Sequence, residues 1–290
     1  MSPNNIILTI WITTELILGQ SILSQLQSFF IAVIPQSEDH NVIIDRIVDQ
    51  IGWSMGLLII ALPVTSYTVD KITKIVYERG NGMTKERRSS ETKLVKELSI
   101  TSGSENSQDL PFIKQTSTKI EKFPLSKAKT LSSILLMIAV TSSSLLSHLL
   151  LSQIQIDDYT NDLKFKYLPY VIMTIYVFLS GHVWAARNLY VFAANEQENQ
   201  SKILMVCNSF QLLAAPIVCA MTENMTKSEE FPYGDWRRFY LRICGGLMVN
   251  LCLPFCLLYW HFYRSETERD EVETKVAAAE KSTLRDQNQA

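Results

Sequence analysis

Apolar residues gather in six long stretches that are separated by polar and charged segments. These stretches cover residues 6–34, 51–69, 130–156, 168–194, 203–221 and 239–263. A helix needs about 20 residues to cross the hydrocarbon core of a bilayer, and each stretch has about that length or more. Of the 27 basic and 29 acidic residues, only Glu15, Arg187 and Arg242 fall inside them. The pattern therefore predicts an all-α, polytopic membrane protein built as a six-helix bundle.

The fourth stretch, 168–194, carries a polar stripe. Tyr176, Ser180, Trp184 and Asn188 follow one another at intervals of four residues, and Arg187 lies beside them. Residues at this spacing share one face of a helix. A face of this kind has no favourable contact with lipid, so it requires either a neighbouring helix that bonds to the polar groups or a watery pathway for a solute. The sequence leaves both interpretations open.

The first stretch carries the acid that lies deepest in any apolar segment. Glu15 follows Ile6 by nine residues, which is about 13 Å along a helix axis. A carboxylate at the bilayer centre costs at least about 2.5 kcal/mol unless it is paired, protonated or hydrated. We therefore expect Glu15 to face the bundle interior, with Gln20 further along the same helix. It serves either as a structural hydrogen-bonding group or as a solute contact.

Charge between the apolar stretches predicts the orientation of the chain. Segment 70–129 holds 13 basic and 8 acidic residues, whereas the three segments on the opposite side together hold 6 and 11. Basic segments stay in the cytosol, so 70–129 and both termini are expected there. Asn224 begins an Asn-Met-Thr sequon on the outer side and is the expected glycosylation site.

The same pattern divides the chain into four parts. Residues 1–69 hold the first two spans, 70–129 a cytosolic loop, 130–263 spans three to six, and 264–290 a cytosolic charged tail. The loop is rich in Ser, Thr and Lys and poor in large apolar residues, so we expect it to be disordered. We expect a multi-pass membrane protein that is located in the plasma membrane.

Signatures of enzymes are missing from the sequence. It contains no H-E-x-x-H, no G-x-S-x-G and no Walker loop, so we expect no catalytic residues and no cofactor. Cys252 and Cys256 share a helix face, yet no His or Cys set beside them completes a metal site. The expected partners are the lipid bilayer and a small solute, and not nucleic acid.

Several segments carry a resemblance to known transporters. At the end of the second stretch, the run Ser66-Tyr67-Thr68-Val69-Asp70-Lys71 resembles the small-x-x-x-Asp-Arg/Lys turn of the major facilitator superfamily. Segments 61–79, 168–221 and 239–264 resemble solute carrier family 43 in order and spacing. That family comprises facilitative carriers of large neutral amino acids and, in one branch, of purine nucleobases.

The resemblance implies that the six spans form the carboxy-terminal half of a carrier, with spans one and four lining the solute cavity. Glu15 and Gln20 would then offer polar contacts, Tyr176 and Trp184 an apolar wall, and Ser180 and Asn188 orienting contacts. It also implies a cytosolic gate formed by Asp70, Lys71 and Arg187.

A carrier of this superfamily has two such halves, and alternating access needs both. The expected partner is therefore a second six-helix bundle or another copy of this chain, unless the chain is a fragment of a longer product. The alternative is a non-transporting interaction or scaffold protein derived from a carrier, which would use 70–129 and 264–290 as docking surfaces.

Overall fold

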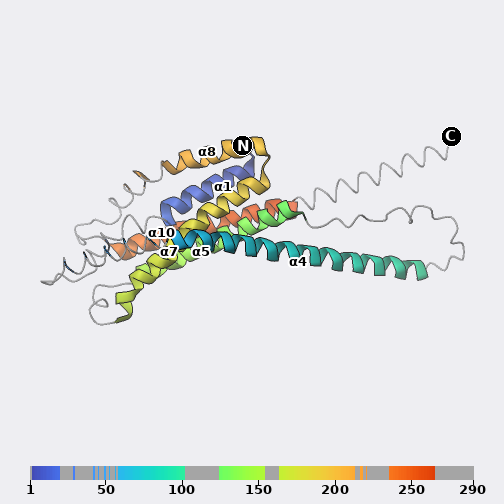
Figure 1. Ribbon diagram of the computed structural model, residues 1–290, viewed down its shortest axis with the longest axis horizontal. Coiled ribbons are helices and arrows are strands. Elements are labelled where there is room, and N and C mark those ends of the chain that lie inside the picture. Colours follow the sequence, from blue (N-terminus) through green and yellow to red (C-terminus); the bar gives the residue numbers. More distant parts are fainter. Residues whose placement is uncertain are drawn as a thin grey trace.

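The computed structural model describes five continuous parts of the chain, and every element in them is helical, with no strand (Figure 1). These parts are 2–19, 58–101, 124–153, 163–212 and 235–264. The structure also describes the separate positions 29, 42, 45, 49, 52, 56, 216, 217 and 220. The prediction of an all-α fold is confirmed for this portion. Gln20, Asn224 and the tail after Arg264 lie outside the described residues.

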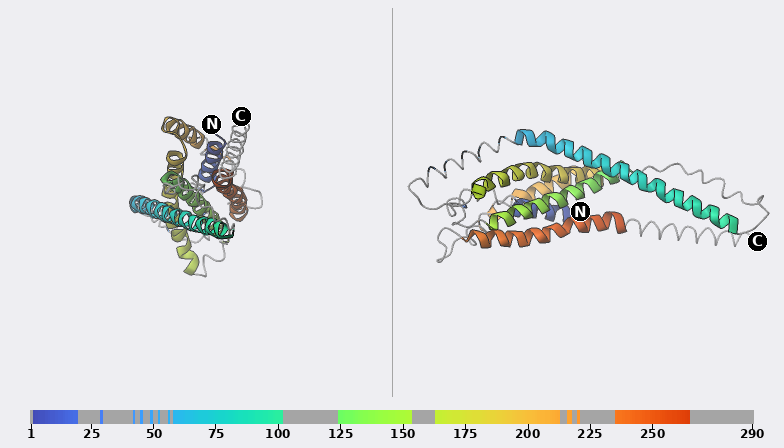
Figure 2. Two further views of the ribbon diagram at one scale, coloured as in Figure 1. Left: turned by 90° about the vertical axis from the view of Figure 1, so that its right-hand side faces the viewer. Right: turned by 90° about the horizontal axis from the view of Figure 1, so that it is seen from below.

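Each described helix overlaps one of the predicted apolar stretches. They are α1 (Pro3–Thr14), continued by the π-helical turn η1 (Glu15–Gly19); α4 (Leu58–Thr101); α5 (Leu125–Ser152); α7 (Leu163–Ala194); α8 (Gln197–Leu212); and α10 (Trp236–Leu258), continued by η2 (Tyr259–Arg264). They pack side by side into an elongated bundle (Figure 2). Within the described residues, two helices have the length and composition to cross a membrane, Leu125–Ser152 and Trp236–His261.

Helix α4 extends further than the sequence pattern predicts. It continues through the first half of the expected loop, to Thr101, and projects beyond the other helices (Figure 2). The segment after Pro63 contains no proline before Pro111 and is rich in Lys, Glu and Arg, which are strong helix formers. One ion pair at helical spacing, Lys74 to Glu78 at 4.0 Å, adds a small stabilisation.

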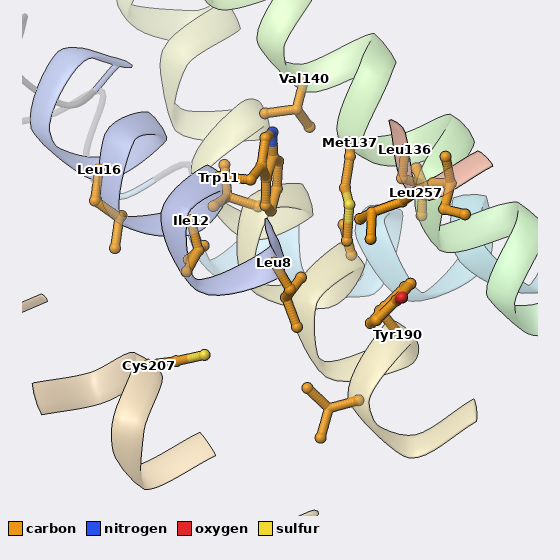
Figure 3. Close-up of a cluster of buried hydrophobic side chains, with 14 of the residues drawn as sticks. Leu8, Trp11, Ile12, Leu16, Leu136, Met137, Val140, Tyr190, Cys207 and Leu257 are labelled. Atoms are coloured by element: carbon orange, nitrogen blue, oxygen red, sulfur yellow. The ribbon is translucent and has the colours of Figure 1, made fainter. Parts of the chain in front are cut away.

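The bundle core surrounds the first helix. Leu8, Trp11 and Ile12 on α1 are fully buried, as are Met137 on α5 and Tyr190 on α7. In Figure 3 these side chains converge from three helices. Helix α1 therefore occupies an interior position, with its exposed positions confined to one narrow side that includes Ile6 and Ile10.

Contacts at both ends of α10 show how the first apolar stretch runs. The amide nitrogen of Asn4 lies 3.4 Å from Nε2 of His261, which also lies 2.5 Å from the hydroxyl of Tyr190. At the opposite end, the ring of Phe29 lies 5.9 Å from the ring of Trp236. Residues 4 and 29 therefore contact α10–η2 at His261 and Trp236, which are about 37 Å apart along the helix at 1.5 Å per residue.

Large apolar side chains also line the outer surface of the bundle. On α10 and η2 they include Leu241, Met248, Val249, Phe255 and Tyr259. The outer face of α4 shows the same feature at Ile59, Ile60, Val64, Tyr67 and Ile75. Continuous exposed apolar surface of this kind marks a region that contacts lipid or another protein.

Neighbouring glycines on α10 give a matched test of this packing. A Cβ atom at Gly246 would lie 2.5 Å from Cδ1 of Leu18, whereas one at Gly245 would meet nothing within 4 Å. We expect Gly246→Ala to be less stable than Gly245→Ala by about 1 kcal/mol, because the terminal methyl group of Leu18 must move. Gly245→Ala should be neutral, or stabilising by up to about 1 kcal/mol. Thermal unfolding of both purified variants in detergent measures the difference, and equal transition temperatures would contradict the predicted contact.

Candidate functional site

Polar side chains of the described residues form two separate clusters inside the bundle. The carboxylate cluster consists of Glu15, Trp11, Thr141, Ser144 and Asn250. The guanidinium cluster consists of Trp184, Arg187, Asn188 and Asn208. The first cluster is built around Glu15 and the second around Arg187, each of which lies in an apolar stretch of the sequence. In both clusters the partners of this ionisable side chain are neutral.

The carboxylate cluster joins three helices. Glu15, at the start of the π-helical turn, is 1% exposed. Its Oε1 accepts a hydrogen bond from the hydroxyl of Ser144 at 2.6 Å, and its Oε2 accepts one from Thr141 at 3.0 Å. The amide nitrogen of Asn250 donates to Oε2 as well, at 3.0 Å. Both carboxyl oxygens are therefore engaged by α5 and α10.

Further contacts fix the geometry of this cluster. Nε1 of Trp11 donates to the hydroxyl of Thr141 at 3.0 Å, and this hydroxyl in turn donates to Glu15. A Cβ atom at Gly19 would lie 2.8 Å from Oε1 of Glu15, so only glycine leaves room for the carboxyl group. These contacts hold Glu15 as a fixed interior hydrogen-bonding group. The solute contact expected of it stays a prediction.

The guanidinium cluster lies between α7 and α8. The side chain of Arg187 is 6% exposed. Its Nη1 donates to Oδ1 of Asn208 at 2.7 Å, while Nε and Nη2 donate to Oδ1 of Asn188 at 3.1 and 2.9 Å. The guanidinium carbon lies 4.5 Å from the centre of the Trp184 ring, a cation–π contact.

No acid neutralises this arginine among the described residues, where the one ion pair joins Lys74 to Glu78 on the outside of α4. Its charge is met by two amide oxygens and an indole face. An arginine at the centre of a membrane helix costs about 2.5 to 3.5 kcal/mol without compensation. Trp184 is 37% exposed and Asn208 is exposed as well, so the cluster reaches the outer surface of α7 and α8.

The structure brings together part of the predicted solute site. Trp184 and Asn188 lie in the guanidinium cluster, together with Arg187, which the resemblance assigned to the gate. Tyr176 is buried and lies within electrostatic range of the Glu15 carboxyl group. Glu15 itself bonds to α5 and α10 and not to the cluster on α7 and α8. The side chain of Ser180 is outside the described set.

The remaining two residues of the expected gate, Asp70 and Lys71, are exposed on α4. The ammonium group of Lys71 lies 5.6 Å from the centre of the Tyr67 ring. Within the described residues neither side chain forms an ion pair, either with the other or across the bundle.

Sequence reasoning did not assign Asn208, Asn250, Thr141 and Ser144 to a site. The available signal was their polarity within apolar stretches, since an isolated Asn in such a segment needs a hydrogen-bonding partner. Which partner each one finds depends on how the helices are rotated against one another, and this is not encoded in the spacing along one helix.

Comparison with known proteins does not identify a family. No protein-family model matches the chain, and searches of curated proteins and of solved structures find no match. The function is therefore inferred from the geometry of the two clusters, the surface of the bundle and the resemblance carried by the sequence.

Ser142 and Ser144 on α5 provide a matched test of the carboxylate cluster. Ser144→Ala removes the 2.6 Å hydrogen bond to Glu15 and should destabilise the protein by about 1 to 3 kcal/mol. Ser142, which is exposed on the same helix, is the matched control, and Ser142→Ala should change stability by less than about 0.5 kcal/mol. Thermal unfolding in detergent reports both values, and an unaffected Ser144→Ala variant would show that the carboxyl group does not need this donor.

Proposed function

We propose that this chain is a membrane-embedded six-helix bundle that acts as one half of a facilitative carrier for a small organic solute. The apolar outer surfaces of α4 and α10 support a lipid environment. Two helices of spanning length and composition support it too. The contacts of Asn4 and Phe29 with opposite ends of α10–η2 are those expected if the first stretch crosses the bundle beside the last.

The guanidinium cluster is the observation that carries the proposal of transport. It holds a buried cation against two amides and an indole ring, and the indole ring of Trp184 and the amide of Asn208 are exposed on the outer surface of α7 and α8. Lipid cannot satisfy such groups, so this side of the bundle must face water or another protein. A carrier half needs a polar face of this kind, because its solute site lies between two bundles.

The resemblance to solute carrier family 43 supplies the proposed solute class, which is a large neutral amino acid or a purine nucleobase. The partner is a second six-helix bundle or another copy of this chain. In the proposed orientation the loop 70–129 and both termini are cytosolic, Asp70 and Lys71 lie at the cytosolic gate, and Asn224 carries a glycan outside. Gln20 and Ser180 complete the proposed solute contacts.

A second candidate function is favoured by one feature of the fold. Helix α4 projects beyond the bundle and presents charged side chains, including Lys74 and Glu78, to the surroundings. A carrier half does not require such an arm, whereas a membrane-anchored interaction protein would use it as a docking surface. In that case the guanidinium cluster serves only the packing of α7 against α8.

Uptake measurements separate the two candidates. Cells expressing the chain alone test a homo-oligomer, and cells that also express the amino-terminal half of a family 43 carrier test a paired bundle. We expect uptake of radiolabelled leucine or adenine above that of untransfected cells in at least one arrangement. If neither solute enters in either arrangement while the protein reaches the plasma membrane, the carrier proposal fails.

Two exposed aromatic residues on α7 provide the matched variants. Trp184 stacks on Arg187, whereas Phe192, two turns further along, is 56% exposed. We expect Trp184→Leu to reduce uptake at least about tenfold at equal surface abundance, because the stacked guanidinium loses its orientation. Phe192→Leu should leave uptake unchanged. A Trp184→Leu variant that alters only protein abundance would favour the interaction protein.

A further inference from the structure

We propose that Arg187 binds the carboxylate group of the solute and thereby selects acids over neutral nucleobases. This inference rests on the proposed function, because it assigns the solute to the polar face between two bundles. The observation behind it is the positive charge of Arg187, uncompensated within the described part of the chain. Arg187 carries one positive charge, is 6% exposed, and has no acidic partner among the described residues.

The hydrogen bonds of the guanidinium group orient it for binding an anion. Described residues engage three of its five N–H groups, one at Nε, one at Nη1 and one at Nη2, all with amide oxygens. Amide oxygens hold the planar group in place without cancelling its charge. One N–H on each terminal nitrogen has no bond to a described residue, and an arginine with an N–H available on both terminal nitrogens can donate two hydrogen bonds to a carboxylate.

The charge of the cluster also decides between ligand classes. Apart from Arg187, the members Trp184, Asn188 and Asn208 are neutral, so the cluster matches a single negative charge. A phosphate carries close to two negative charges at neutral pH, and one arginine leaves part of that charge unpaired. A neutral purine base accepts hydrogen bonds from a guanidinium group but lacks the attraction between opposite charges that a carboxylate adds. The remaining exposed part of the Trp184 ring offers an apolar surface to a hydrocarbon side chain.

Direct binding to the purified full-length chain tests this assignment independently of transport. The probes are L-leucine, L-leucinamide, which replaces the carboxylate by an uncharged amide, and adenine, each measured by calorimetry in lipid nanodiscs. We expect leucine to bind at least tenfold more tightly than leucinamide or adenine, a difference of about 1.4 kcal/mol. Comparable binding of leucine and leucinamide, tighter binding of adenine, or no binding of leucine would overturn the proposal.

Substitutions then locate the effect. Arg187→Gln keeps hydrogen-bonding capacity but removes the charge, and it should abolish the preference for leucine over leucinamide. Arg242, which is exposed on α10, is the matched control, and Arg242→Gln should retain that preference. An unchanged preference in Arg187→Gln would overturn the assignment. If Arg187→Gln does not fold, the comparison of the three probes on the unaltered protein still decides the outcome.

The result separates this inference from the proposed function. Leucine binding that depends on Arg187, in a protein without uptake in cells, supports the carboxylate site and refutes the carrier. Uptake that is indifferent to both the carboxylate and Arg187 supports the carrier and refutes the carboxylate site.

Discussion

The buried carboxyl group of Glu15 constrains the arrangement of three helices. A carboxyl group removed from water needs hydrogen-bond donors, and here it receives them from Thr141 and Ser144 on α5 and from Asn250 on α10. These bonds join residues that lie 126 to 235 positions apart in the sequence. They set the rotation of α1 against its neighbours, and the close approach at Gly19 follows from the same geometry.

Because Glu15 is fully engaged inside the bundle, it does not neutralise Arg187. Both side chains have neutral partners. Hydroxyl and amide groups donate hydrogen bonds to Glu15, and amide oxygens accept hydrogen bonds from Arg187. An ion pair between them would have cancelled both charges and left no reason for an anion to bind. Their separation leaves Arg187 buried behind the exposed Trp184 and Asn208, fixed in orientation and without an acidic partner in the described part of the chain.

Much of the helical framework was predictable, because the free energy of placing apolar and charged residues in a bilayer depends mainly on composition. The third, fourth and sixth apolar stretches lie within described helices for most of their length, and the interior position of Glu15 followed from the cost of exposing it to lipid. The four-residue spacing on α7 placed Trp184 and Asn188 on one face correctly. The continuation of α4 to Thr101 was not predicted, since a charged segment without proline is compatible with either a helix or a solvated linker.

The sequence by itself determined that the described part of the chain is all-α, and which apolar segments carry a charged residue. Only the tertiary structure decided which polar groups meet. It directs Glu15 towards α5 and α10, and it directs Arg187 towards Asn208 on α8. The physical reason is that spacing along a helix fixes which side chains share a face. The partner of that face depends on how separate helices are rotated and packed, which is a property of the whole bundle.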